Sequence, residues 1–145
     1  MRVRLERRYR FCASHLYRRE EWSEEENRAR FGACANLPGH GHNYRLYVTV
    51  AGSVDRATGF MVDLPALDAL VQEEVITQLD HQHLNHAVPE FGPGGEIPTS
   101  ENLILWIHER LSSGLGSLGG GGEVELLRLR LEEDEDLAAE WVAGD

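Results

Sequence analysis

The segment from Cys34 to Tyr44 contains a thiol and two imidazoles, those of Cys34, His40 and His42, within nine residues. If His40 and His42 lie in extended chain, the two-residue period of side chains in a strand points both rings to one side. Gly41 between them leaves the other side uncrowded. Such a pair can hold one metal ion.

A third histidine, His15, stands at the end of an earlier segment, residues 3–14, whose apolar residues alternate as in a strand. If this strand neighbours the one that contains His42, the three imidazoles converge where the strands end. Three histidines without a fourth protein ligand are typical of a catalytic zinc site, in which water or substrate takes the open position. The alternative is that each histidine is solitary and hydrogen-bonded.

Cys34 lies six positions before His40, in a predicted loop near this candidate metal site. A nearby metal would lower the pKa of its thiol from a free value of about 8.5, and the thiolate could then act as a general base. A buried apolar residue and a fourth zinc ligand are alternatives that the sequence leaves open. Cys12 has the opposite strand parity to His15, and we expect it to pack in the core.

Asp80 and His81 follow a predicted helix. A carboxylate can fix the tautomer of an imidazole and stabilise its protonated form, so the pair is a candidate acid/base unit. Adjacent side chains diverge on a regular helix, and cooperation therefore requires a helix end or a partner from elsewhere in an assembly. The alternative is a helix C-terminus at which the histidine interacts with the helix dipole.

Glu132 is a further candidate because it ends a predicted strand, where a carboxylate can accept paired N–H bonds from a heterocycle. It also opens the acidic run of residues 132–136, which alone indicates an ordinary solvated turn.

The composition limits the classes of function. A net charge of −11 argues against a nucleic-acid or anionic-membrane partner, since both require a basic face. All 14 basic residues are arginine, which excludes Schiff-base lysine chemistry. With 145 residues, no apolar core of signal-peptide length and no run of about 18 apolar residues, we expect one soluble, cytoplasmic domain, residues 1–145.

The elements that position these residues follow from hydrophobic periodicity and capping signals. We expect strands at 3–14 and 43–52, a hairpin connection to a third strand at 60–62, and a loop or short helix within 16–38. Asp63 is expected to cap a helix that extends to about residue 79, and Thr99 or Ser100 a second helix. Strands at 123–131 and 137–142 complete the order β-β-α-α-β-β. This order indicates an α+β fold with two helices on one face of an antiparallel sheet.

Taken together, these residues resemble the 6-pyruvoyl-tetrahydropterin synthase family, which includes the 6-carboxytetrahydropterin synthases of queuosine biosynthesis. The resemblance covers nearly the whole chain. It rests on motifs in the family order, namely Phe11 to His15, Cys34 with His40 to Tyr44, Gly59 to Asp63, Leu79 to His81 with Leu84-Asn85, and Pro98 to Asn102.

The resemblance implies roles for these residues. His15, His40 and His42 match the zinc (Zn2+) ligands, and Cys34, Asp80 and His81 match the catalytic thiol and its partners. Thr99 and Glu101 match the segment that frames the pterin. Glu132 matches the pterin-anchoring glutamate, but threonine usually follows that glutamate, and Glu133 stands here instead, which leaves the choice between the two open.

The implied fold is the tunnelling fold, in which subunits join their sheets into a barrel, commonly a homohexamer of two stacked trimers with active sites at subunit interfaces. The implied substrate is 7,8-dihydroneopterin triphosphate. Five residues separate Cys34 from His40, as in the 6-pyruvoyl synthases, whereas the 6-carboxy enzymes usually have three. The spacing favours the 6-pyruvoyl product. The 6-carboxy product and a non-catalytic, zinc-stabilised binding module with Cys34 as fourth ligand are the alternatives.

Overall fold

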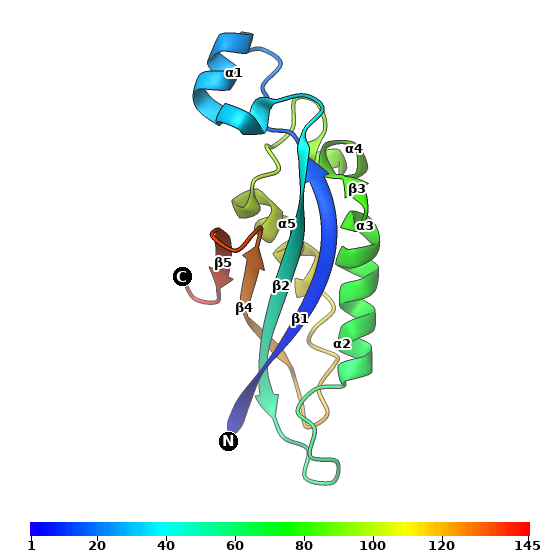
Figure 1. The fold of residues 1–145 in the computed structure, drawn as a ribbon. Coiled ribbons are helices and arrows are strands. Elements are labelled where there is room, and N and C mark those ends of the chain that lie inside the picture. Colours follow the sequence, from blue (N-terminus) through cyan, green and yellow to red (C-terminus); the bar gives the residue numbers. More distant parts are fainter.

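The computed structural model describes residues 1–145, and its frame is a five-stranded sheet in the order β3-β1-β2-β4-β5. At its centre the long strands β1 (Arg2–His15) and β2 (His40–Ser53) pair antiparallel along their whole length, and this pairing places His15 opposite His40. Strand β4 (Glu125–Glu132) continues the sheet beside β2, and β5 (Ala138–Val142) forms one edge. Figure 1 shows the strands as one curved layer with the main helices behind it.

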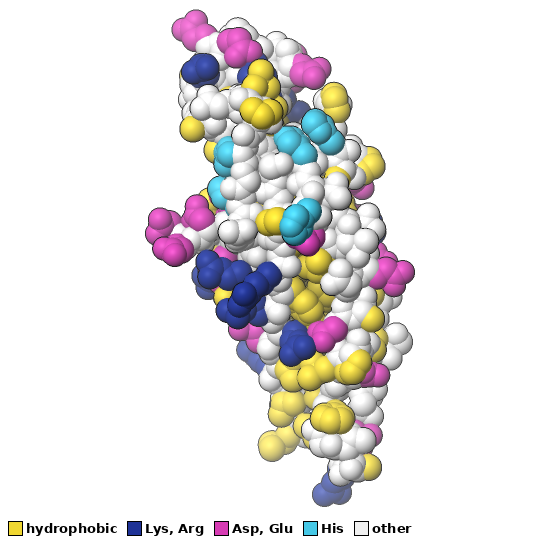
Figure 2. All heavy atoms as spheres, turned by 45° about the vertical axis from the view of Figure 1, so that its right-hand side comes forward, with side chains coloured by type: hydrophobic (Ala, Val, Ile, Leu, Met, Phe, Trp, Pro, Cys, Tyr) yellow, Lys and Arg dark blue, Asp and Glu magenta, His cyan; other side chains and the backbone are white.

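The alternation of side chains decides which residues face these helices. In β2, Tyr44, Leu46 and Val48 are buried and join one apolar core with the helices, whereas Arg45 and Tyr47 face the other side. That other face is polar, and Figure 2 shows arginine side chains gathered over the strands in the middle of the molecule. One face of the sheet is therefore covered within the chain, and the opposite face is not.

Two capped helices cover the apolar face. Asp63 caps α2 (Leu64–Val71) by accepting a hydrogen bond from the backbone N–H of Ala66, 3.0 Å away. The helix continues through a wider π turn (Gln72–Ile76) into α3 (Thr77–Leu79). Thr99 caps α5 (Ser100–Ser112) in the same way, by accepting from the N–H of Asn102. The predicted positions of both helices are confirmed.

The polar segment between β1 and β2 contains α1 (Glu24–Phe31), followed by a 3-10 turn (Gly32–Ala35) that carries Cys34. Asn27 is fully buried and organises this segment, because its amide donates to the carbonyls of Arg19, Trp22 and Ser23 and accepts from the N–H of Arg19. The segment that carries the thiol is thus held by hydrogen bonds between the Asn27 side chain and the backbone.

The structure differs from the sequence-based expectation in two places. Residues 60–62 form no strand, since both edges of β2 are already paired with β1 and β4; only Val62 bridges to Gly119. Strand β3 (Gln82–His83), parallel to β1, and α4 (Leu84–Ala87) were not expected, because such short elements carry no periodic pattern. A third short turn, Pro89–Phe91, follows α4. No helix has the length and apolar character needed to cross a membrane.

Candidate active site

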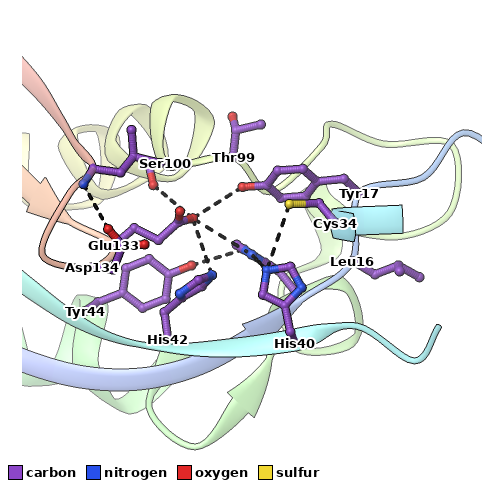
Figure 3. A network of polar contacts seen from close by, with 12 residues as sticks. Leu16, Tyr17, Cys34, His40, His42, Tyr44, Thr99, Ser100, Glu133 and Asp134 are labelled. Atoms are coloured by element: carbon purple, nitrogen blue, oxygen red, sulfur yellow. Dashed lines mark hydrogen bonds and ion pairs between the residues drawn. The ribbon is translucent and has the colours of Figure 1, made fainter. Parts of the chain in front are cut away.

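The three predicted histidines meet at one end of the sheet, on its helix-covered face. His15 ends β1, and His40 and His42 begin β2 with the same parity as the buried Tyr44. The Nε2 atoms of His15 and His40 lie 3.2 Å apart, and one ring nitrogen from each of the three histidines lies within 4.8 Å of the others. Figure 3 shows the labelled rings of His40 and His42 pointing toward the same space.

The environment of His15 keeps its imidazole neutral. The side chain is fully buried, and burial, together with the charges of His42 and His40, lowers the pKa of His15 to about 3. The hydroxyl of Tyr44 lies 3.1 Å from Nδ1 of His15. When Nδ1 carries the proton and donates it to Tyr44, the lone pair of Nε2 is free and points to the other histidines, as a metal ligand requires.

A metal ion fits this donor set. Nε2 of His42 is buried and has no hydrogen-bond partner, which is costly unless something else binds it. A tetrahedral zinc ion with Zn–N bonds of about 2.0–2.1 Å separates its ligand atoms by about 3.3 Å, close to the distance between His15 and His40. Three neutral imidazoles are also the donors that zinc prefers.

Cys34 lies beside this cluster, with its Sγ 4.0 Å from Nε2 of His40 (Figure 3). The backbone carbonyl of Cys34 accepts a hydrogen bond from the N–H of Tyr17, so the 3-10 turn is tied to the chain just after β1. In the metal-free site, burial raises the pKa of the Cys34 thiol, and the charge of Glu133 raises it further.

The acidic residue at the cluster is Glu133, not Glu132. Alternation along β4 places Leu129, Leu131 and Glu133 on the helix-covered face, and Glu133 is buried with Oε1 3.9 Å from Nε2 of both His15 and His42. Glu132 points to the opposite face, where it lies 4.0 Å from Arg45. Glu132 therefore cannot act at the histidines of its own chain, whereas Glu133 lies beside His15 and His42, and Asp134 lies within reach of His42.

Asp80 and His81 do interact, because the helix ends between Leu79 and Asp80. His81 has a φ of 59°, in the left-handed region that non-glycine residues rarely adopt, and its Nδ1 lies 3.0 Å from Oδ2 of Asp80. The Cys12 N–H donates to the other carboxylate oxygen at 2.9 Å, and this hydrogen bond, followed by that of His81, holds the pKa of Asp80 below its usual range.

The structure does not bring the Asp80–His81 pair to Cys34 within one chain. The pair contacts Cys12 instead, and His81 borders a surface hollow that Cys12, Ser14 and Asn43 also line. Cys12 is half-buried on the face away from the helices, because His15 and Phe11 on the opposite parity face the core. The expectation that Cys12 packs in the core is therefore wrong. Any cooperation between His81 and Cys34 has to cross between chains.

The predicted pterin-framing residues, Thr99 and Glu101, lie at the start of α5, where the neighbouring Ser100 contacts Glu133. The hydroxyl of Thr99 is used to cap α5, and the neighbouring Ser100 donates to Oε1 of Glu133 at 3.3 Å. Glu101 is exposed, and its charge helps to raise the pKa of Tyr17 above its ordinary value, an effect led by burial, Glu133 and Cys34. Tyr17 was missed as a site residue, although it shares the parity of His15, and of the two glutamates that the sequence left open it is Glu133 that lies beside the histidines.

Comparisons with known proteins show the family to which the chain belongs. The family model described as 6-pyruvoyl tetrahydropterin synthase matches residues 4–143. The chain is 39% identical to the 6-pyruvoyl tetrahydrobiopterin synthase of Homo sapiens over 109 residues, 75% of this chain and 74% of the relative. It is 32% identical to the dihydroneopterin monophosphate aldolase of Pyrococcus furiosus over 140 residues, 97% of each. The structure of the Caenorhabditis elegans 6-pyruvoyl tetrahydropterin synthase superposes with a TM-score of 0.85 at 31% identity, covering 99% of this chain and 97% of that one.

The fold and the matches define an α+β enzyme of the pterin-synthase class. The chain belongs to the 6-pyruvoyl tetrahydropterin synthase family.

Proposed function

We propose that this protein is a zinc-dependent lyase that converts 7,8-dihydroneopterin triphosphate to 6-pyruvoyl-tetrahydropterin and triphosphate. The observation that carries the proposal is the convergence of three imidazole nitrogens, one of them buried and unpartnered, beside a cysteine. The family membership and the five residues between Cys34 and His40 support it.

His15, His40 and His42 would hold the zinc ion. When bound, zinc supplies Lewis acidity, which polarises hydroxyl groups of a substrate and makes the adjacent C–H bonds more acidic. The role of this chain's residues is then to orient the pterin side chain and to move protons. Cys34, whose Sγ is 4.0 Å from Nε2 of His40, would accept a proton from the side-chain carbon.

Asp80 and His81 would complete the proton path from a neighbouring subunit. The side chain of His81 is 79% exposed in the single chain, so another chain can cover it, and Asp80 fixes its tautomer by accepting from Nδ1. This arrangement requires an oligomer with sites at subunit interfaces. We propose a hexamer of two trimers whose sheets form a barrel, with the uncovered sheet face directed inward.

The remaining polar groups would frame the pterin. Thr99 and Glu101, at the N-terminal end of α5, would contact the ring, as the family resemblance implies. Elimination of triphosphate with internal rearrangement needs no external oxidant, because the electrons stay within the substrate.

Two other pterin reactions are candidates for the same site. The 6-carboxytetrahydropterin synthase reaction cleaves the side chain further and is an activity within this family. An aldolase reaction on dihydroneopterin monophosphate is favoured by the match to the Pyrococcus furiosus enzyme across nearly its full length. All three would start from proton transfer at the side chain, so only the products separate them.

The test has two parts. Purified protein is expected to contain about one zinc per chain, since three histidines form one site, and Cys34→Ala is expected to keep this zinc while losing triphosphate release. Full activity in Cys34→Ala contradicts the proposed proton acceptor. Loss of zinc in that variant supports instead a closed, four-ligand site in a non-catalytic binding module.

A further inference from the structure

The uncovered face of the sheet carries an arginine cluster, which consists of Arg8 and Arg10 on β1, Arg45 on β2 and Arg130 on β4. The antiparallel register sets Arg10 directly opposite Arg45. It also sets Arg8 and Arg130 on either side of Tyr47, one step further along the same face. The four guanidinium groups thus belong to one small area across three adjacent strands, where Figure 2 shows arginine side chains gathered.

The chain does not neutralise this arginine cluster. Its one ion pair joins Arg45 to Glu132, and the two atoms, Nε and Oε2, are 4.0 Å apart. The other three arginines form no ion pair, and none of the four side chains donates a hydrogen bond within the chain. Nε of Arg130 is buried and has no partner. This is notable in a protein of net charge −11, which has an excess of carboxylates.

The neighbouring charges serve other partners. Arg128, the next arginine on this face of β4, donates from Nε to Glu140 at 2.7 Å, and Glu6 lies 4.0 Å from it on the other side. Asp80 borders the cluster, but its carboxylate accepts from a backbone N–H of β1 and lies 3.0 Å from Nδ1 of His81. Arginines on this face are therefore paired beside the cluster and left unpaired within it.

The arrangement costs free energy in the isolated chain. Like charges directly opposite each other on neighbouring strands destabilise a sheet, as Arg10 and Arg45 do here. A buried N–H without an acceptor, such as that of Arg130, adds a desolvation penalty. Arg10, Arg45 and the amide of Asn43 also line an open hollow of about 550 Å³. An anion bound at the hollow would relieve both costs.

The spacing of the cluster selects the kind of anion. Guanidinium groups bind phosphate oxygens through paired hydrogen bonds, and arginine is favoured where phosphate is recognised. Arg8 and Arg130 are separated by two strand spacings, about 9.5 Å. One phosphate group is too small to neutralise all four arginines, whereas a chain of linked phosphates carries several charges over such a length.

We infer that the arginine cluster binds a chain of linked phosphates, the chemistry of inorganic triphosphate, at a site separate from the histidines. The cluster lies on the uncovered face of the sheet, and His15, His40 and His42 lie on the helix-covered face. The inference needs neither zinc nor the proposed reaction, because one chain supplies all four arginines. In the proposed hexamer the clusters would line the inside of the barrel and could hold triphosphate away from the catalytic centre.

The test is the affinity for inorganic triphosphate, measured by isothermal titration calorimetry on the wild type and on the double variant Arg10→Gln/Arg130→Gln. The double variant is expected to bind roughly 100-fold more weakly, about tenfold for each charge-assisted hydrogen bond that is lost. The matched control, Arg28→Gln/Arg56→Gln, removes two exposed arginines elsewhere and changes the net charge equally. Its affinity is expected to stay within about twofold of the wild type, because distant exposed charges are screened.

Glu132→Gln gives a readout in the opposite direction. It removes the one carboxylate paired with the cluster, so triphosphate is expected to bind about two- to fivefold more tightly, the usual range for a weak ion pair that competes with a ligand. Triphosphate should also raise the urea concentration at which the wild type unfolds, since it binds only the folded state, and should not do so for Arg10→Gln/Arg130→Gln.

The same titrations with zinc-free protein distinguish this site from the histidine site. Binding that survives zinc removal supports the inference, and binding that disappears with the zinc places the anion at the histidines and overturns it. Equal affinity of the wild type and Arg10→Gln/Arg130→Gln also overturns it, as does a single-stranded oligonucleotide that binds more tightly than triphosphate. Failure of the proposed function would appear in the reaction products and leave these titrations unchanged.

Discussion

Nδ1 of His81 lies 3.0 Å from a carboxylate oxygen of Asp80, although the two residues are adjacent in the chain. On a continuing helix their side chains would diverge. The helix ends at Leu79, and the left-handed backbone of His81 turns its ring back to Asp80. A strained backbone that persists at an acid/base pair is a reason to look for function there.

Two substitutions distinguish the effect of the left-handed turn at His81 from the effect of its imidazole. Asparagine tolerates a positive φ, so His81→Asn should keep the fold while removing the acid/base group. We expect the rate of triphosphate release to fall about 10²–10⁴-fold, the usual contribution of a general acid or base, with zinc content unchanged. His81→Ala should lose the same activity and also unfold at lower urea. Activity retained in His81→Asn would show that only the turn matters.

Sites shared between chains predict complementation. Neither Cys34→Ala nor Asp80→Asn should be active alone, but hexamers assembled from a mixture of both should regain activity, because some sites then combine an intact thiol from one chain with an intact Asp80–His81 pair from another. The measurement is product formation after the two purified variants are unfolded together and refolded. A mixture no more active than its components contradicts a site built across subunits.

Gly39 holds the loop before His40 in a conformation that only glycine allows. Its φ is +118°, and an added Cβ would lie 2.4 Å from the carbonyl oxygen of His15. Gly39→Ala should therefore displace His15 and His40 and lower zinc retention. Gly59→Ala is the matched control, since Gly59 also has a positive φ but open space around it. We expect Gly39→Ala to be less stable than the control by about 1–3 kcal/mol, measured by urea unfolding, and equal stability would exclude the clash.

Asn27 should determine the order of the segment that carries Cys34. Asn27→Ala removes the acceptor of the half-buried Arg19 N–H and the side-chain hydrogen bonds to three backbone carbonyls, which we expect to cost about 1–3 kcal/mol. Proteolysis should then cut within residues 16–38 of the variant sooner than in the wild type. Asn36→Ala, at an exposed position in the same segment, is the control and should change neither result.

Stability at acidic pH should depend on Asp68, which joins α2 to β1. Arg7 donates two hydrogen bonds to its carboxylate and Tyr9 donates one, and these interactions, led by Arg7, hold the pKa of Asp68 below its usual range. A lowered folded-state pKa stabilises the protein above the unfolded-state pKa of about 3.9, and this stabilisation is lost as the pH falls through the folded-state value. Asp68→Asn should thus lose stability at pH 7 but show a smaller further loss between pH 5 and pH 2 than the wild type in urea titrations.

Much of the fold and the metal cluster could be predicted from sequence because the signals are periodic. The His-Gly-His spacing and the parity of His15 placed three rings on one face, and Asp63 and Thr99 cap their helices as expected. The open choice between Glu132 and Glu133 could have been decided by the same reasoning, since Leu129 and Leu131 share the parity of Glu133. Adjacent acidic residues obscured that pattern, because a charged run also indicates a solvated turn.

Other features depend on contacts that the local sequence does not encode. Residues 60–62 resemble a strand but find no free edge of β2 to pair with. The place of Cys12 depends on which face of β1 the helices cover, and parity alone does not decide that. The Asp80–His81 pair does not reach Cys34 within one chain. The residues with which this pair acts therefore depend on how the chains assemble.

The central claim is tested most directly by identifying what the zinc-loaded protein makes from 7,8-dihydroneopterin triphosphate, by mass spectrometry of the reaction mixture. We predict 6-pyruvoyl-tetrahydropterin and triphosphate in equal amounts, with neither product formed after zinc is removed. A 6-carboxypterin with acetaldehyde, or unchanged substrate from fully zinc-loaded protein, would contradict the account.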